Sequence, residues 1–409
     1  MSKLKIGIIG AGVTGLSAAW DLIRAGHEVT IYEAEDRVGG LAGGFRDPSW
    51  DWELEKFYHH WFTTDTDLLT LTEEMGVRDR VIFPRPKTSY WIDGKIYRSE
   101  ISPSAIFLPL PLIPKLRFAL GGVLLKLTSN WRALEKVTAH DWFLRVMGES
   151  AYNTFFRPLL IGKFGEEYTK VNMAWMWARV KTRSLRLGTF EGGFQAFLDT
   201  LAGQLRDRGV TIHLRSPIEG ISSIDGKPAL TVSGVTETFD RVLSTTSPSL
   251  LLRLTPEIQG TSFAEKVRAL HSIGAICVVV TIREQLLTDG TYWLNLPASS
   301  TDKRANRFPF LALVEHTNWM DRAHYNGDRI LYLGDYVPVD HEYFRLSDDE
   351  LADRLLASLP IVNPAFTRDW VKKVWVFRAP YAQPVPYVNH SEKLPPVETP
   401  LPGLYWASS

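Results

Sequence analysis

The first part of the chain holds two short apolar runs separated by a segment with helical periodicity. Residues 5–9 (KIGII) are continuously apolar, which is typical of a buried parallel strand. One face of a helix follows, formed by Val13, Leu16, Trp20 and Ile23. Gly26 ends that helix, and residues 29–32 form a second apolar run before Glu33. The pattern predicts a strand, a helix and a strand in close succession.

Apolar residues with the spacing of helices and of strands also alternate along the rest of the chain, and this pattern predicts an α/β protein. Asp93-Gly94 is the turn of a hairpin within residues 88–97, and Asp225-Gly226 is the turn of a small meander. The expected helices are residues 63–75, 138–147, 194–205 and 347–359. The expected strands are residues 210–214, 221–224, 229–232, 237–239, 241–245, 275–282, 310–314, 329–332, 371–376 and 403–409.

Three glycines between the first strand and its helix form the pattern G-x-G-x-x-G. Gly10 allows the tight turn, Gly12 lets the backbone approach a pyrophosphate, and Gly15 lets the helix pack closely on the strand. Glu33 is placed to accept hydrogen bonds from a ribose hydroxyl. Strand, glycines, helix, strand and acid in this order predict a dinucleotide site. A glycine-rich turn in an ordinary α/β domain is the alternative.

The residues after Glu33 point to a particular dinucleotide. Arg37-Val38-Gly39-Gly40-Leu41 places two adjacent glycines where a backbone can approach a ligand closely. With this run the chain resembles the flavoprotein group of flavin amine oxidases, protoporphyrinogen oxidases, carotenoid desaturases and UDP-galactopyranose mutases. The resemblance implies that FAD rather than NAD is bound, by the glycine pattern, Glu33, Arg37, Gly39, Gly40 and Leu41. It also implies that the backbone of Ile218 holds the adenine.

The order of elements predicts a Rossmann-type FAD domain built from separated pieces, because the strands before Thr245 and Ser408 are expected to return to the cofactor. The FAD domain is assigned to residues 1–76, 189–254 and 391–409. The substrate domain is assigned to residues 77–188, which look mainly helical, and to residues 255–390, which supply a mixed sheet.

The segment Phe57-Tyr58-His59-His60-Trp61 follows the double glycine. In the flavoprotein group this segment passes beside the flavin ring, and the mutases carry histidines there. The resemblance therefore makes His59 and His60 the candidate catalytic residues, with at most one of them acting in catalysis. The alternative is a histidine that serves as a structural hydrogen bonder in a packed aromatic loop.

Charge and composition narrow the partners. The 46 basic and 46 acidic residues balance, so no basic field for nucleic acid is expected. No H-E-x-x-H or paired C-x-x-C motif suggests a metal, and no G-x-S-x-G motif suggests a nucleophile. A cationic, aromatic cluster contains Trp175, Trp177, Arg179, Arg183 and Arg186. Such arginines can clamp an anionic substrate, but a solvated face or stacking on the tryptophans is favoured.

Residues 106–127 form the stretch with the strongest apolar character, but Pro109, Pro111, Pro114, Lys115 and Arg117 argue against a membrane-spanning helix. A helix packed inside the substrate domain is favoured over a helix that anchors the protein on a membrane surface. Cys277 is the single cysteine and sits in an apolar run, so a buried thiol and a cytoplasmic location are expected. The N-terminus enters the first strand almost at once, which leaves no room for a signal peptide.

The sequence thus indicates FAD-dependent oxidation of a small organic substrate, with hydride transfer to the flavin. A redox-neutral sugar-nucleotide mutase or related carbohydrate enzyme is the second reading, prompted by the histidines and the arginine cluster. A flavin-binding protein without turnover is the third. Substrate, electron acceptor and oligomeric state are left open.

The run Gly403-Leu404-Tyr405-Trp406-Ala407 reads as a strand arriving at the cofactor. In the flavoprotein group a matching strand is followed by a loop and a helix, whereas this sequence stops at Ser409. We therefore expect a shortened chain whose sheet exposes an uncovered apolar face.

Overall fold

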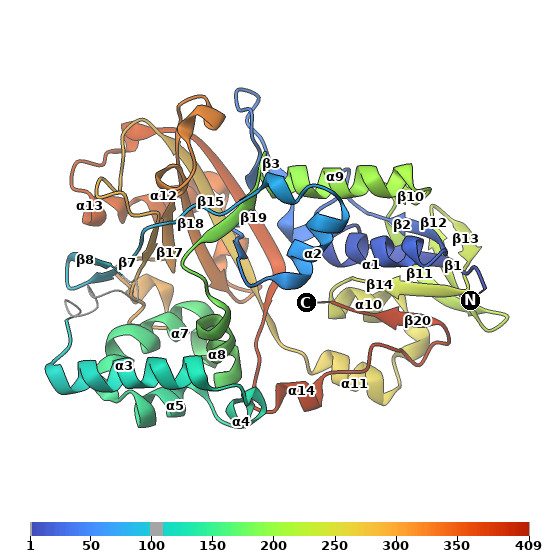
Figure 1. Ribbon diagram of the computed structural model, residues 1–409, viewed down its shortest axis with the longest axis horizontal. Coiled ribbons are helices and arrows are strands. Elements are labelled where there is room, and N and C mark those ends of the chain that lie inside the picture. Colours follow the sequence, from blue (N-terminus) through green and yellow to red (C-terminus); the bar gives the residue numbers. More distant parts are fainter. Residues whose placement is uncertain (1, 99–108, 409) are drawn as a thin grey trace.

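A five-stranded parallel sheet organises one half of the protein in the computed structural model, which describes residues 2–98 and 109–408 (Figure 1). β1 lies at the centre, and its Ile9 is paired with Tyr32 of β2 on one side and with Ser244 of β14 on the other. The strand order is β10 (Thr211–His213), β2 (Glu28–Tyr32), β1 (Lys5–Ile9), β14 (Arg241–Ser244) and β20 (Leu404–Trp406). The sheet confirms the Rossmann-type α/β class, and its strands come from widely separated parts of the sequence.

Two apolar clusters cover this sheet. In the first, Leu16 and Trp20 of α1 pack with Phe197 and Leu201 of α9. The second contains the meander and the helices that follow it, and it includes Val242. The elements concerned are α1 (Val13–Arg24), α9 (Phe194–Asp207), β11 (Ile218–Ile224), β12 (Lys227–Val232), β13 (Val235–Thr238), α10 (Pro248–Leu254) and α11 (Ser262–Arg268).

A seven-stranded mixed sheet forms the other half. Its order is β19 (Val371–Pro384), β15 (Ser272–Ile282), β18 (Arg329–Val337), β17 (Ala312–Glu315), β16 (Trp293–Asn295), β7 (Thr88–Ile92) and β8 (Lys95–Arg98). β15 is buried along almost its whole length, which confirms the expected burial of Cys277. α12 (Asp348–Leu356) begins with the expected capping box, formed by Ser347 and Glu350, and α13 (Leu359–Val362) follows it.

Short elements join the two halves. β9 pairs with both β5 and β6, and β3 pairs with β4. The bounds of these strands are β3 (Gly44–Phe45), β4 (Leu54–Glu55), β5 (Trp61–Phe62), β6 (Val81–Ile82) and β9 (Leu187–Phe190). Two further helices outside the sheets are α2 (Thr66–Glu74) and α14 (His390–Lys393).

A helical part follows β8 in the sequence and lies away from the parallel sheet in Figure 1. It comprises α3 (Leu112–Leu127), α4 (Trp131–Glu135), α5 (Ala139–Val146), α6 (Glu149–Ala151), α7 (Arg157–Phe164) and α8 (Met173–Thr182). The expectation that the apolar stretch at 106–127 packs inside the domain is wrong for α3, because that helix buries Gly121 and Leu125 but exposes Leu112 and Leu120 by 72% and 70%. Residues 106–108 lie outside the described residues.

The expected uncovered face at the end of the chain is not seen at β20. Leu404 and Trp406 are buried, and they belong to the same cluster as Phe263 of α11 and Leu251 of α10. Tyr405 points to the opposite face and is partly exposed. The helices α10 and α11 and the meander, which come earlier in the chain, therefore cover the side of β20 that carries Leu404 and Trp406.

Candidate functional site

The carboxyl ends of the parallel strands bring four predicted cofactor residues to one edge of the sheet. Gly10, Glu33, Thr245 and Ser408 follow β1, β2, β14 and β20, which are neighbours in register. The Thr245 amide and hydroxyl both donate to the carbonyl of Ile9, at 3.0 and 2.8 Å. Neighbours β2 and β14 lie on opposite sides of β1, which makes this edge the switch point where ligands bind in open α/β sheets.

The glycines of the first turn serve different purposes. A Cβ on Gly15 would lie 2.0 Å from the carbonyl oxygen of Gly10, and one on Gly10 would lie 2.5 Å from Oγ1 of Thr245. Both glycines are therefore required by the fold itself. Gly12 has an ordinary φ of −74°, and its nearest neighbour would be Cα of Gly40 at 4.0 Å. The protein leaves the space in front of Gly12 open.

The start of α1 faces this open space with hydrogen-bond donors. Among the described residues no acceptor is recorded for the amides of Thr14 and Gly15. Unsatisfied amides and the positive end of the helix dipole together attract phosphate. An open glycine beside unpaired amides fits a pyrophosphate, as the sequence predicted.

Glu33 is held ready beside the glycine turn. Its Oε2 accepts from the Ala11 amide at 2.7 Å and its Oε1 from the Glu35 amide at 3.0 Å. A carboxylate has about four acceptor positions, so two remain for ribose hydroxyls. The segment that leads to β11 crosses the same edge, because the Ser216 amide donates to the carbonyl of Glu33 at 2.8 Å. Ile218 begins β11 and is partly buried, and its contact with the adenine stays a prediction.

A glutamine that the sequence reasoning missed braces the double-glycine loop. Gly39 has φ +134° and its amide donates to the carbonyl of Ala11 at 2.9 Å. Gln195 of α9 accepts from the Gly44 amide at 2.9 Å and donates to the carbonyl of Val38 at 3.0 Å. A buried amide with both ends used fixes the loop against the sheet. Nothing in the helical pattern around Gln195 signals this contact.

Arg37 and Leu41 lie at the outer side of this loop. The Arg37 guanidinium binds Glu53 in a bidentate pair at 2.9 and 3.1 Å and reaches Asp199 at 3.1 Å. Leu41 is 39% exposed, next to Gly40. The ion pairs hold Arg37 near the loop, and direct contact of Arg37, Gly39, Gly40 and Leu41 with FAD stays a prediction.

The two candidate histidines lie in different surroundings. His60 lies among the rings of Tyr292, Trp293 and Trp319, and its Nε2 is hydrogen-bonded to the Tyr292 hydroxyl. Burial, together with the nearby His59, lowers the pKa of His60 to about 3, so its imidazole is neutral. His60 therefore matches the structural alternative.

His59 has a different environment, because its buried Nδ1 has no hydrogen-bond partner among the described residues. Burial is the main cause that lowers the pKa of His59; an interaction of the ring with the backbone of Phe57 opposes this shift, and the nearby Lys163 adds to it. The ring lies 6.1 Å from that of Phe194, whose amide donates to Glu55 at the start of the same segment. An unpaired buried nitrogen is costly unless a ligand or water meets it.

A lysine that the sequence reasoning missed lies near His59. Lys163 of α7 is 7% exposed, and its Nζ lies 3.4 Å from the centre of the Tyr336 ring. Burial, with a contribution from Arg179, lowers the pKa of Lys163 well below its usual range. Tyr58 packs directly on Gly334 of the same strand as Tyr336. Lys163 lies in the apolar stretch RPLLIGKF, which gives no sign that it faces a site.

The arginine cluster is split. Arg179 stacks on Trp175 at 4.2 Å, as favoured from the sequence. Its side chain is solvent-exposed, and desolvation by the groups packed around the guanidinium lowers the pKa of Arg179. Among the described residues no carboxylate lies within ion-pair distance of Lys163, Arg179 or Arg183. Arg186 donates to the carbonyl of Phe83 at 2.9 Å and lies apart from this group.

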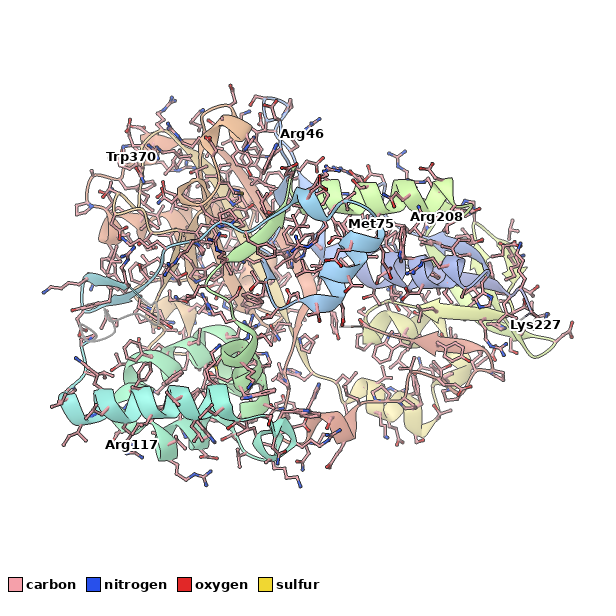
Figure 2. The ribbon with its side chains drawn as sticks, viewed as in Figure 1. Arg46, Met75, Arg117, Arg208, Lys227 and Trp370 are labelled. Atoms are coloured by element: carbon pink, nitrogen blue, oxygen red, sulfur yellow. The ribbon has the colours of Figure 1, made fainter. Side chains whose placement is uncertain are left out.

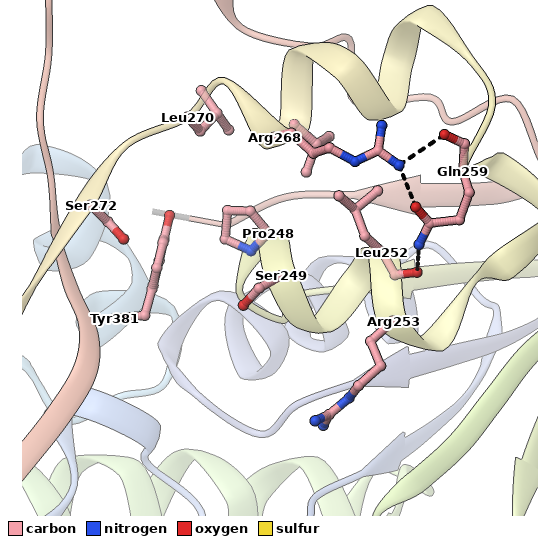
Figure 3. Close-up of a pocket in the computed structure, with 10 residues that line it drawn as sticks. Pro248, Ser249, Leu252, Arg253, Gln259, Arg268, Leu270, Ser272 and Tyr381 are labelled. Atoms are coloured by element: carbon pink, nitrogen blue, oxygen red, sulfur yellow. Dashed lines mark hydrogen bonds between the residues drawn. The ribbon is translucent and has the colours of Figure 1, made fainter. Parts of the chain in front are cut away.

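A hollow of about 490 Å³ next to α10 and α11 contains none of the predicted residues (Figure 3). Arg268 donates to Gln259, which in turn donates to the carbonyl of Leu252. These polar groups use their hydrogen-bonding capacity on one another, so the hollow offers a ligand fewer free donors and acceptors than the sheet edge does. The sheet edge is therefore the better candidate for the cofactor, and binding there stays a prediction.

Within residues 2–98 and 109–408, no helix has both the length and the apolar character needed to cross a membrane. In the same residues, no group of three His, Cys, Asp or Glu side chains could hold a metal ion.

Comparison with known proteins identifies the family. The model of the flavin containing amine oxidoreductases matches residues 13–409. A probable zeta-carotene desaturase of Synechococcus elongatus is 26% identical over 57% of this chain and 54% of its own length. The coproporphyrinogen III oxidase of Staphylococcus aureus is 22% identical over 98% of this chain and 92% of its own length. The fold is similar to that of reduced UDP-galactopyranose mutase, with a TM-score of 0.72, 18% identity and coverage of 96% and 86% of the two chains.

Proposed function

This chain belongs to the flavin containing amine oxidoreductase family, and we propose that it oxidises a small organic molecule by hydride transfer to FAD. The chain spans about half the length of the desaturase and nearly all of the coproporphyrinogen III oxidase. The names of the two relatives state different compounds, so the substrate class is inferred from the residues around His59 in this chain.

The residues of the sheet edge hold the cofactor in this proposal. The amides at the start of α1 receive the pyrophosphate beside Gly12, and Glu33 receives the ribose. Gln195 fixes the double-glycine loop, which leads directly into the segment with His59. The cofactor edge and His59 are thus connected by a short, braced piece of backbone.

The unpaired Nδ1 of His59 is the observation that carries the proposal. Lys163 lies nearby, and burial favours the uncharged form of both side chains. Uncharged nitrogens are competent to accept a proton, and loss of a hydride from an amine or alcohol carbon leaves one proton to be removed. We assign that proton to His59 or Lys163, while the rings of Tyr58 and Tyr336 bound the substrate.

Anaerobic mixing of the FAD-loaded protein with amines, alcohols and porphyrinogens tests the proposal. One of these classes should bleach the flavin absorbance, and air should restore it. A flavin that stays oxidised with every class, in a protein that turns over only after chemical reduction, would contradict the proposal.

A redox-neutral sugar-nucleotide mutase is the second candidate. The guanidinium groups of Arg179 and Arg183 lack carboxylate partners among the described residues, and such a pair suits a diphosphate. Turnover of a sugar nucleotide by the reduced protein alone would favour this candidate. A protein that binds FAD but does neither reaction would be a flavin-binding protein without turnover.

The single cysteine supports a reducing, cytoplasmic setting for this enzyme. Cys277 is buried in β15, and burial raises the pKa of its thiol. The chain therefore has no exposed thiol and no disulfide to maintain.

A further inference from the structure

One helix of the protein carries an unusually large amount of exposed apolar surface. Seven of the fifteen exposed large hydrophobic residues in the described part of the chain lie on the 16-residue α3. Their exposure ranges from 48% to 78%, and they are Leu112, Ile113, Leu116, Leu120, Val123, Leu124 and Leu127. Monomeric proteins seldom leave such a contiguous patch without a partner.

These seven residues occupy one side of the helix. At 3.6 residues per turn they fall within an arc of about 120°. The opposite side packs inward, where Phe118 lies 5.4 and 5.9 Å from the rings of Phe155 and Phe156. Gly121 is buried, and a Cβ there would lie 2.8 Å from Met147. α3 is therefore fixed to the protein by its inner side, and its apolar side stays outside.

The position of α3 leaves that side accessible. In Figure 1 the helix runs along the lower left margin of the molecule, away from the parallel sheet. Arg117, labelled in Figure 2, extends from the same margin.

Positive charge surrounds the apolar side. α3 carries Lys115, Arg117 and Lys126 and no acidic residue. Arg117 donates to the carbonyls of Val146 and Arg145, and no ion pair with a carboxylate is recorded for it within the described residues. Residues 109–186 hold thirteen Lys and Arg against five Asp and Glu, although the whole chain has a formal charge of zero. The segment that contains α3 therefore has a net positive charge.

We propose that the apolar side of α3 docks the protein on the surface of an anionic lipid bilayer. An apolar stripe with flanking cations is the pattern of helices that lie in the membrane interface, and anionic headgroups attract the cations. Sixteen residues span about 24 Å, less than the roughly 30 Å of a hydrocarbon core, so the helix lies in the surface and does not cross it. A second copy is a poorer occupant, because a symmetric interface would place two positive regions against each other.

Vesicle flotation with the FAD-loaded protein tests this proposal. The probes are vesicles of phosphatidylcholine alone and vesicles of phosphatidylcholine with phosphatidylglycerol. One variant replaces three exposed residues of α3: Leu116→Gln, Leu120→Gln and Val123→Gln. The matched control replaces three equally exposed valines elsewhere, Val235→Gln, Val339→Gln and Val397→Gln, with exposures of 58–71% against 56–70% on α3.

The wild type and the control should float with the anionic vesicles, and the α3 variant should bind at least about tenfold less. Binding should weaken with added salt and be lower on phosphatidylcholine alone. Equal flotation of the two triple variants would overturn the proposal, as would a wild type that stays in solution. A wild-type dimer that the α3 variant converts to monomer would overturn it too, because the occupant would then be a second copy. An unchanged flavin spectrum in both variants shows that they are folded, and the result is independent of substrate oxidation.

Discussion

Replacement of Gly12 by alanine separates the needs of the fold from the needs of the cofactor. The new methyl group meets no protein atom closer than 4.0 Å, and φ of −74° suits alanine. The unfolding free energy of the apo protein should therefore change by no more than about 1 kcal/mol, the range for exchanging the residue that caps a helix. The methyl group does occupy the approach of the pyrophosphate. Loss of one charge-assisted hydrogen bond costs about 1.5–3 kcal/mol, so FAD affinity should fall about tenfold to a hundredfold.

The assay combines FAD titration, followed by flavin fluorescence, with urea unfolding of the apo protein. Gly203→Ala is the matched control, because a Cβ at that position of α9 also meets nothing within 4 Å. That variant should bind FAD like the wild type. Gly15→Ala should instead destabilise the apo protein, since its Cβ would lie 2.0 Å from the carbonyl oxygen of Gly10. Wild-type FAD affinity in Gly12→Ala would refute the placement of the pyrophosphate.

Three further predictions concern buried charged groups. Lys303→Met should lower the unfolding free energy by about 3–5 kcal/mol in urea titrations, because Asp335, which lies 2.7 Å from Lys303 Nζ, is left buried without its partner. Adding Asp335→Leu should restore most of the lost unfolding free energy. No recovery in the double variant would count against the broken ion pair as the cause. Burial raises the pKa of Glu55 to about 7, so the folded state retains a proton that the unfolded state releases, and stability should fall by about 3 kcal/mol as pH rises from about 4.5 to 7. Glu55→Gln should flatten this dependence in melting curves across that range, and an unchanged slope would contradict the assignment. Lys163→Met should slow turnover by about a hundredfold or more while the protein keeps its full FAD content. The control Lys170→Met, at an exposed lysine, should turn over like the wild type. Equal turnover rates of the two variants would show that Lys163 does not transfer the proton.

Much of the cofactor half was predictable because its determinants are local. The glycine turn, the helix after it and Glu33 lie within one strand–helix–strand unit, and the structure has these elements at the expected positions. The strands before Thr245 and Ser408 were also identified, since each is a short apolar run. Sequence patterns suffice where a function depends on backbone shape within one motif.

The surroundings of His59 and His60 were not predictable in the same way. His59 and His60 are adjacent, and they differ because the partner of His60 is Tyr292, a residue 232 positions away. Lys163 looks like part of an ordinary helix until β18 brings Tyr336 over its amine. Such contacts are created by tertiary packing between distant segments, to which local periodicity is blind.

The apolar stretch before α5 shows a further limit. Its composition predicts a helix, and the structure has α3 there, but composition does not tell which side neighbouring helices will cover. Burial of the helix was expected because most apolar helices of globular proteins are packed. The structure reverses that expectation on the side of Leu112 and Leu120.

Hydrogen exchange of the apo and FAD-loaded protein tests the central claim, that FAD is held at the carboxyl edge of the parallel sheet, most directly. Added FAD should slow exchange in the amides of residues 12–15, 39–41 and 245–246, which follow β1, β2 and β14. The amides around the hollow of α10 and α11, including that of Gln259, should exchange as before. Protection of that hollow, with no change at the glycine turn, would contradict the account.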